Sequence, residues 1–130
     1  MDFPTVELGR TAQVEEEVTE ELTALRMKSG SLPVYATPAM AALMENAATL
    51  VMAPLLPEGW TSVGTGLDIQ HKAPTVVGRK VIAEAKITAM DGRKITFAVR
   101  AFDGTSEIGS GVHERFLVQG DKFLAKAEKR

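Results

Sequence analysis

The sequence predicts an α+β fold in which an antiparallel sheet wraps around one long central helix. A nearly unbroken apolar run extends from Ala39 to Leu56, and a helix that is apolar almost all round must be covered by other structure. After Trp60, apolar and polar residues alternate in four segments, as they do in strands that bury one face. A sheet that curls around the helix is the simplest arrangement that buries both.

The composition indicates one soluble globular domain. The chain has 130 residues, of which 45% are hydrophobic and 25% are charged, so we expect residues 1–130 to form a single domain with one core. The net charge of −2 predicts no broad basic face, which argues against a nucleic-acid partner. The absence of Cys excludes disulfides and thiol catalysis, and two His residues are too few for a His-rich metal site.

No segment predicts export or membrane insertion. The first ten residues lack the basic region and apolar stretch of a signal peptide. Glu45, Asn46 and Pro54 interrupt the apolar run, which argues against a membrane span. We therefore expect a cytoplasmic protein.

The first predicted elements are a short strand that ends at Val18 and a short helix from Glu20 to about Met27. The region fits two patterns, because both strand alternation and helical spacing place Val14 and Val18 on one face. We divide it by placing a helix cap at Thr19.

The central helix is predicted to run from Pro38 to about Met52. Thr37 is a good N-cap, and Pro at the first helical position has no amide hydrogen to leave unpaired. Pro54 and Pro57 end the helix.

Four strands follow, separated by turn signals that include Asp91-Gly92 and Asp103-Gly104. The predicted strands are Ser62–Lys72, Arg79–Ala89, Lys94–Phe102 and Glu107–Val118. Asp121 is then expected to cap a terminal helix from Lys122 to about Lys129.

The side chains predicted to face the helix are, in the first strand, Val63, Thr65, Leu67, Ile69 and His71; in the second, Val81, Ala83, Ala85 and Ile87; and in the third, Ile95, Phe97, Val99 and Ala101. This order of elements is the hot-dog arrangement. Because one curled sheet leaves exposed edges, we expect the chain to dimerise through an edge strand.

Glu45 is the most informative candidate residue, because it lies inside the apolar run. Desolvating an unpaired carboxylate costs several kcal/mol, roughly, and a poorly solvated carboxylate is a stronger base or nucleophile than one in water. The structural alternative, an interface carboxylate or one that pairs with Arg115, fits the sequence equally well.

His71 is the candidate partner of Glu45, since the alternation places it on the strand face that points to the helix. Imidazole titrates near ~6.5 when unperturbed and therefore exchanges protons at neutral pH. The alternative is a core histidine with a structural role only.

Thr37 is the third candidate, although helix capping alone explains it. Thr37 and Glu45 are eight positions apart, about 12 Å of helical rise, so they cannot hydrogen-bond directly within a regular helix. A shared pocket needs His71 or substrate between them, an irregular helix, or a second subunit that supplies one of them.

Two kinds of residue on the strands are candidates for substrate binding. Gly64 and Gly66 lie early in the first strand after the helix, where a main-chain N–H can stabilise an oxyanion; a bulge in a curved strand is the equal alternative. Arg115 either binds a phosphate or forms an ion pair. Gly109 and Gly111 are expected to relieve crowding where the sheet bends.

Three short segments, in this order and spacing, carry a resemblance to a known family. They are Thr37-Pro38-Ala39-Met40 leading to Met44-Glu45, Gly64-Thr65-Gly66 with His71 after it, and EIGSGVHER from Glu107 to Arg115. Together with the DKFLAKA segment that follows the last strand, they resemble the fluoroacetyl-CoA thioesterase group of hot-dog thioesterases from about Val34 to about Ala127.

The resemblance implies a homodimer, or a dimer of dimers, that hydrolyses acyl-CoA thioesters without a metal or redox cofactor. It implies catalytic roles for Thr37, Glu45 and His71. It also puts Gly64 at the thioester oxygen or CoA, and Arg115 at the substrate or CoA.

One departure from the family concerns the acyl group. The specialised enzyme has aromatic residues ahead of the catalytic Thr, which form a lid, whereas residues 27–32 of this chain contain no aromatic. We therefore expect a small or medium acyl-CoA as the substrate rather than fluoroacetyl-CoA alone. Two other functions stay open, a hot-dog hydratase or dehydratase acting on acyl thioesters and a non-catalytic acyl-CoA-binding domain.

Overall fold

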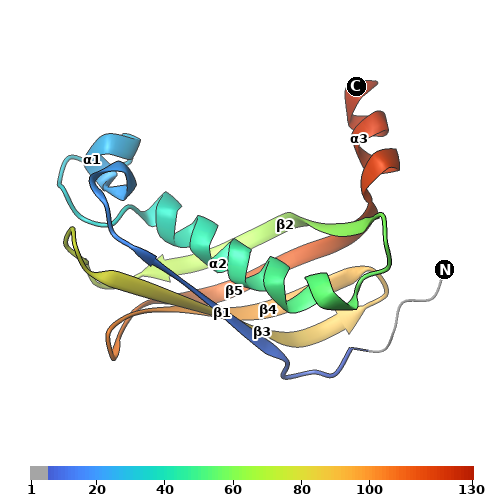
Figure 1. Cartoon of the computed structure of the whole chain (residues 1–130), viewed down its shortest axis with the longest axis horizontal. Coiled ribbons are helices and arrows are strands. Elements are labelled where there is room, and N and C mark those ends of the chain that lie inside the picture. Colours follow the sequence, from blue (N-terminus) through green and yellow to red (C-terminus); the bar gives the residue numbers. More distant parts are fainter. Residues whose placement is uncertain (1–5) are drawn as a thin grey trace.

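The computed structural model describes residues 6–130 and consists of one antiparallel sheet with a long helix across one face (Figure 1). The strands are β1 (Thr11–Glu17), β2 (Trp60–His71), β3 (Lys80–Asp91), β4 (Lys94–Asp103) and β5 (Ser106–Gln119). The helices are α1 (Ala24–Met27), α2 (Thr37–Met52) and α3 (Gly120–Glu128), with short 3₁₀ helices η1 (Glu20–Leu22) and η2 (Ala53–Leu55).

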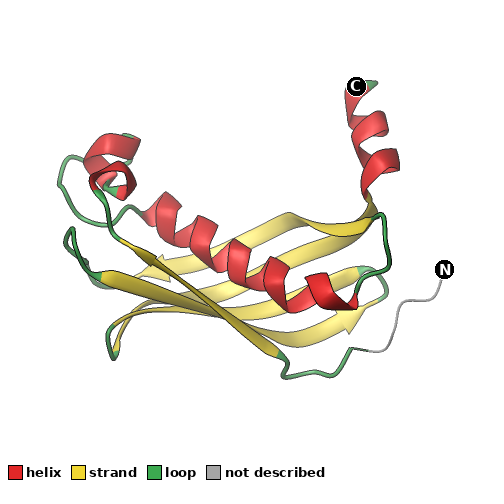
Figure 2. Cartoon of the chain, viewed as in Figure 1, coloured by secondary structure: helices red, strands yellow, loops and turns green. Residues whose placement is uncertain are grey.

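The sheet has the strand order β1-β3-β4-β5-β2, so β1 and β2 are its edges. Figure 2 shows α2 lying along the concave face of the curved sheet, with α1 close to the N-terminal end of α2 and α3 at the opposite end of the molecule. The predicted α+β class, with the sheet wrapped around a central helix, is confirmed. Among the described residues, no helix is long and apolar enough to cross a membrane.

The core forms where α2 meets β3 and β4. Every residue predicted to face the helix from these two strands is at most 1% exposed. The second contribution comes from α2, whose buried residues are Ala39, Met40, Leu43, Met44, Ala47, Ala48, Val51 and Met52. Burying side chains of this size stabilises the fold by about 1.5–3 kcal/mol for each of the larger ones.

The helix α2 is not covered all round, contrary to the expectation from its apolar sequence. Ala42, Asn46 and Leu50 form an exposed stripe at four-residue spacing, and the Leu50 side chain is 44% exposed. The single curled sheet reaches only the opposite side of the helix, so this stripe faces outward.

Strand β2 departs from the predicted alternation because it contains a β-bulge. Gly64 pairs with Arg115 and Gly66 pairs with Glu114, so Thr65 is the extra residue. Before the bulge, Ser62 is buried and a Cβ atom on Gly64 would point at α2. The prediction that Val63 and Thr65 belong to the buried face is therefore wrong.

Beyond the bulge, the predicted inward positions are correct for Ile69, which packs against the core. The Leu67 side chain, which was also predicted to face inward, is 39% exposed. The prediction for Gly109 is confirmed, since a Cβ atom there would lie 2.6 Å from Met40 Sδ of α2. A Cβ atom on Gly111 would lie 2.1 Å from the Asp68 carbonyl oxygen, so these glycines let β2, β5 and α2 approach closely.

Three predicted caps differ in the structure. The Thr19 side chain caps nothing, and Thr23 instead accepts a hydrogen bond from the Arg26 amide at the start of α1. The N-cap of α3 is Gln119 rather than Asp121, without a side-chain bond. The N-cap of α2 is Ala36, so Thr37 is the first helical residue and Pro38 the second. Capping depends on the backbone angles of the preceding residue, which sequence preference alone does not specify.

Candidate active site

Thr37 and His71 form a direct hydrogen bond where the start of α2 meets the end of β2. Thr37 Oγ1 and His71 Nδ1 lie 2.8 Å apart. Because the backbone of Ala36 occupies the N-cap position, the Thr37 hydroxyl is not used for capping and is available to the imidazole. The structure therefore brings together two of the three predicted catalytic residues.

The His71 ring is suited to proton transfer. Burial lowers the pKa of His71, and the backbone of Ala73 acts in the opposite direction, so the ring is neutral at pH 7. In the described part of the chain, His71 Nε2 is buried without a hydrogen-bond partner. A buried polar atom of this kind is a position at which a substrate or water can bind.

A cavity of about 260 Å³ lies beside this pair, and its lining includes Thr37, His71, Tyr35, Ser29 and Pro74. Its walls come from the loop before α2 and from the residues after β2. The cavity gives an acyl group or a water molecule access to the imidazole.

Tyr35, which the sequence did not single out, supports the His71 ring. The two rings meet edge to face with centroids 6.4 Å apart, and the Tyr35 hydroxyl donates to Glu16 Oε2 at 2.5 Å. Burial, followed by the interaction with Glu16, raises the pKa of Tyr35 far above its ordinary value. Tyr35 therefore remains a neutral hydrogen-bond donor that fixes the packing around His71.

Glu45 lies in the middle of α2 and pairs with Arg115, not with His71. Glu45 Oε2 and Arg115 Nη1 are 3.6 Å apart, and 43% of the Glu45 side chain is exposed. The expectation of a desolvated carboxylate is therefore wrong for a single chain. A direct Glu45–His71 pair is also wrong within one chain, because the hydrogen bond of His71 is to Thr37.

Arg115 is held in place by several contacts of its own. Its Nε donates to Ser62 Oγ at 2.8 Å and its Nη2 donates to the Ser62 carbonyl at 2.9 Å. Burial lowers the pKa of Arg115, and the charge of Glu45 opposes this. The predicted alternative for Arg115, an ion pair with a carboxylate, is confirmed.

His113 completes this group and was not predicted. His113 Nδ1 lies 2.8 Å from the Gly66 carbonyl, to which it must donate, so Nε2 is the acceptor for Arg115 Nη1 at 3.2 Å. Burial is the main cause that lowers the pKa of His113; the Gly66 carbonyl opposes it and Arg115 adds to it. His113 lies two residues before Arg115 on β5, so the strand period could have identified it.

Gly64 brings the backbone of β2 directly under Glu45. A Cβ atom on Gly64 would lie 2.8 Å from Glu45 Oε2, 3.4 Å from His113 Cε1 and 3.5 Å from Arg115 Nη1. Any side chain at position 64 would therefore displace the carboxylate. The stated alternative for Gly64 and Gly66, a bulge in a curved strand, is confirmed.

The predicted site residues thus fall into two groups. The Thr37–His71 pair lies at the first turn of α2, and the Glu45 group, which we define as Glu45, Arg115, His113 and Ser62, lies near its middle. Among residues 6–130, no set of three or more His, Cys, Asp or Glu side chains is arranged to hold a metal ion.

Comparison with known proteins places the chain among thioesterases. The family model described as fluoroacetyl-CoA-specific thioesterase matches residues 18–121. The chain is similar to the fluoroacetyl-CoA thioesterase of Streptantibioticus cattleyicolor, with 41% identity over 97 residues, which make up 75% of this chain and 70% of that protein.

Solved structures agree with this result. A structure of a fluoroacetyl-CoA thioesterase has a TM-score of 0.91 and 33% identity, with 98% of each chain covered. A hot-dog-like protein from Thermanaerovibrio acidaminovorans shares the fold, with a TM-score of 0.85, 24% identity, and coverage of 95% of this chain and 91% of that one. The predicted hot-dog fold and the predicted class of thioester hydrolase are confirmed, and the chain belongs to the fluoroacetyl-CoA-specific thioesterase family.

Proposed function

We propose that this protein is an acyl-CoA thioesterase that hydrolyses a small or medium acyl-CoA to the free acid and CoA. The observation that carries the proposal is the 2.8 Å hydrogen bond between Thr37 and His71 beside a cavity, in a chain of a thioesterase family. Solved structures of similar proteins hold acetyl-CoA in one case and fluoroacetate with CoA in another.

Glu45, His71 and Thr37 are the catalytic residues in this proposal. Glu45 either attacks the thioester carbonyl or activates the attacking water. His71 relays a proton: the neutral ring accepts one from water at one nitrogen and gives one to the departing CoA sulfur. Thr37 orients His71 or the acyl group, or itself acts as the nucleophile. Trapping an acyl adduct on Glu45 would distinguish the nucleophilic role from the general-base role.

Gly64 lies at the thioester oxygen or CoA in this proposal, and Arg115 lies at the substrate or CoA. A main-chain N–H at Gly64 is suited to stabilise the oxyanion, because the missing side chain leaves the backbone accessible next to Glu45. Arg115 is buried and rigidly held by Ser62, so its contribution is a fixed positive charge beside Glu45.

The proposal includes a homodimer in which one copy supplies the Thr37–His71 pair and the other supplies the Glu45 group. Three observations support this: β2 is an edge strand, Leu67 at its centre is 39% exposed, and Leu50 on α2 is 44% exposed. A two-fold axis near Leu67 would lay two β2 strands antiparallel and bring Gly64 of one copy beside the end of β2 in the other. Further association into a dimer of dimers is compatible with this arrangement.

We propose that the protein accepts a broader range of acyl groups than fluoroacetyl alone. The segment before α2 that would form an aromatic lid contains Met27 and Leu32, which are 40% and 64% exposed, and no aromatic residue at positions 27–32. The lining of the cavity includes the Tyr35 ring, but residues 27–32 add no further ring that would narrow the choice of acyl group.

The test is a CoA-release assay over a panel of acyl-CoA thioesters, with the wild type and the variants Glu45→Gln and His71→Ala. We expect the wild type to release CoA and both variants to be strongly impaired, while the exposed Glu58→Gln keeps wild-type activity. Full activity in both variants, or no release from any substrate, contradicts the proposal. Addition of water to an enoyl thioester without CoA release would instead identify a hydratase.

A further inference from the structure

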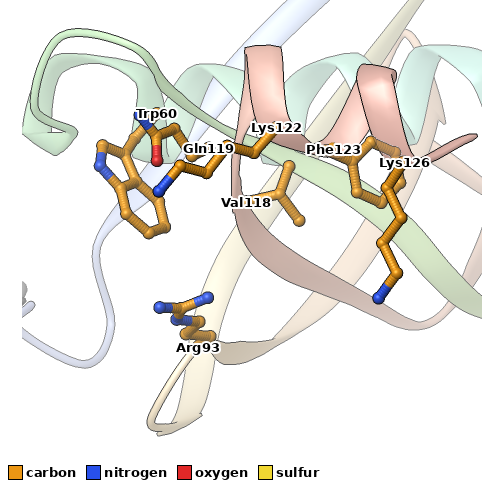
Figure 3. Close-up of a pocket in the computed structure, with 7 residues that line it drawn as sticks. All are labelled: Trp60, Arg93, Val118, Gln119, Lys122, Phe123 and Lys126. Atoms are coloured by element: carbon orange, nitrogen blue, oxygen red, sulfur yellow. The ribbon is translucent and has the colours of Figure 1, made fainter.

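A second cavity lies at the end of the molecule opposite α1. Its volume is about 590 Å³, and its lining residues come from β2, β5, α3 and the turn between β3 and β4. Figure 3 shows Trp60 and Phe123 on opposite sides of this space, with Val118 between them and Arg93 beneath Trp60. Gln119, Lys122 and Lys126 complete the lining, and we call this the Trp60 cavity.

The Trp60 cavity is cationic. Arg93, Lys122 and Lys126 line it, and none of its lining residues within the described part of the chain is acidic. Lys122 and Lys126 are one helical turn apart on α3, where like charges repel each other. A cluster of this kind in a chain with a net charge of −2 favours an anion as the bound group.

Like several other Lys and Arg side chains of residues 6–130, these three cations are not neutralised by an ion pair. Among residues 6–130, ion pairs neutralise six cationic side chains, but Arg93, Lys122 and Lys126 form none. The paired cations are Arg26, Lys72, Arg79, Lys94, Arg100 and Arg115. The Arg93 guanidinium instead lies over the Trp60 ring, 5.0 Å from its centroid.

The aromatic side chains that line the Trp60 cavity indicate that the ligand also contains a flat ring system. Trp60 packs partly against the core, and the Phe123 ring is 45% exposed on α3, a helix without buried residues. Flat apolar rings beside several cations are the features that bind a purine with attached phosphates, by stacking and by charge-assisted hydrogen bonds.

The position of the cavity along β2 fits a ligand that also reaches the Glu45 group. Trp60 is four residues before Gly64 on the same strand, about 13 Å of extended chain. Both residues precede the bulge at even positions, so they share the face of the sheet that carries α2. An extended pantetheine arm spans a separation of this size.

We propose that the Trp60 cavity binds the phosphorylated adenosine of CoA while the thioester lies at Gly64. The inference rests on the proposed function, since it gives that function a subsite for the part of the substrate most distant from the reaction. Arg93 and Lys122 contact the phosphates, and the Trp60 and Phe123 rings contact the purine.

Adenosine 3′,5′-bisphosphate is the direct probe, because it carries the purine and phosphates without the thioester. Trp60 is the one Trp of the chain, so its fluorescence reports on this cavity alone. We expect saturable binding by calorimetry with a parallel change in Trp60 fluorescence. The variants Arg93→Ala and Lys122→Ala should each bind about 10-fold more weakly, because a charge-assisted contact is lost. Lys86→Ala, an exposed lysine on β3 outside the cavity, is the matched control.

Adenosine and inorganic pyrophosphate separate the two halves of the ligand. If the cavity contacts both the purine and the phosphates, adenosine alone and pyrophosphate alone each bind more weakly than adenosine 3′,5′-bisphosphate. Pyrophosphate that binds as tightly as the bisphosphate would contradict the purine contact. No saturable binding at millimolar nucleotide, or undiminished binding in Arg93→Ala and Lys122→Ala, overturns the proposal.

A kinetic comparison separates this inference from the proposed function. Arg93→Ala and Lys122→Ala should raise KM for acyl-CoA by about 10-fold with kcat unchanged, and should leave hydrolysis of the matching acyl-pantetheine unaffected. Equal losses of kcat/KM on acyl-CoA and on acyl-pantetheine would contradict a nucleotide subsite. If no acyl-CoA is hydrolysed at all, the proposed function fails, and the nucleotide titration still decides whether the cavity is a nucleotide site.

Discussion

The Thr37–His71 pair and the Glu45 group lie on the same helix but differ in chemistry. The pair is neutral, beside a cavity, and contains an unpartnered ring nitrogen. The Glu45 group is charged, and its Arg115 is anchored by Ser62 and His113. The first is suited to move protons and the second to stabilise charge. A thioester hydrolysis needs both, so one chain contains both parts without joining them.

Mixing of two inactive variants gives the largest expected effect and tests whether the parts join across a dimer. We expect Glu45→Gln and His71→Ala each to lose about 10³-fold in kcat, because each removes a residue that acts in proton transfer or attack. Mixed under subunit exchange, the two should recover about one quarter of wild-type activity, since half the dimers are mixed and each has one intact site. No recovery, despite exchange shown by mass spectrometry, would place the complete site within one chain.

Substitution of Thr37 separates catalysis from capping. Thr37→Val removes the hydroxyl that bonds to His71 and should lower kcat about 10- to 100-fold. Its effect on the free energy of unfolding should stay below about 0.5 kcal/mol, because the N-cap of α2 is Ala36. Thr37→Ser should retain most of the activity. A loss of about 1 kcal/mol in Thr37→Val with unchanged kcat would identify a capping role instead.

Paired glycine substitutions test the close approach to Glu45. Gly64→Ala should lower kcat/KM about 10-fold or more, because its Cβ would lie 2.8 Å from Glu45 Oε2. Gly66→Ala is the control from the other side of the bulge, where a Cβ would lie 3.3 Å from the end of the flexible Glu114 side chain. Circular dichroism should show that both fold. Equal activity in the two variants would contradict the role of Gly64.

The smallest effect is a dependence of stability on pH. Burial lowers the pKa of His71 and of His113, so below about pH 6.5 the unfolded chain binds more protons than the folded one. The contribution of these two groups to the free energy of unfolding should therefore be constant above that pH and fall as the pH decreases below about 6.5. His113→Gln should reduce the slope of this fall. An unchanged slope in this variant would contradict the contribution of His113.

The sequence predicted the parts of the fold that depend on a regular period. The inward residues of β3 and β4 follow strict alternation, and Pro54 and Pro57 place the end of α2 at Met52 as expected. The face of β2 could not be predicted, since the bulge at Thr65 arises from pairing with β5. Thr19 does occupy the N-cap position of η1, but its side chain makes no capping hydrogen bond. The cap at Asp121 was wrong because α3 begins at Gly120, after Gln119.

The sequence identified the individual residues of the candidate site, but it did not specify which of them contact one another. The alternation placed His71 toward the helix correctly, and the ion pair of Glu45 with Arg115 was one of the stated alternatives. The contact of Thr37 with His71 was one of the stated options, and the structure shows it as a hydrogen bond; what the sequence did not show is that Ala36 occupies the N-cap position and leaves the Thr37 hydroxyl available. The catalytic roles of Thr37, Glu45 and His71 stay predictions.

The bulge in β2 changes which face of the sheet the residues before and after it occupy. Gly64 and His71 are seven residues apart, an odd number, so in a regular strand they would project to opposite sides of the sheet. The extra residue Thr65 shifts the phase by one and turns both toward α2. Deleting Thr65 would therefore keep every other residue of the site and still turn either Gly64 or His71 to the face of the sheet away from α2, and so away from Glu45 or Thr37.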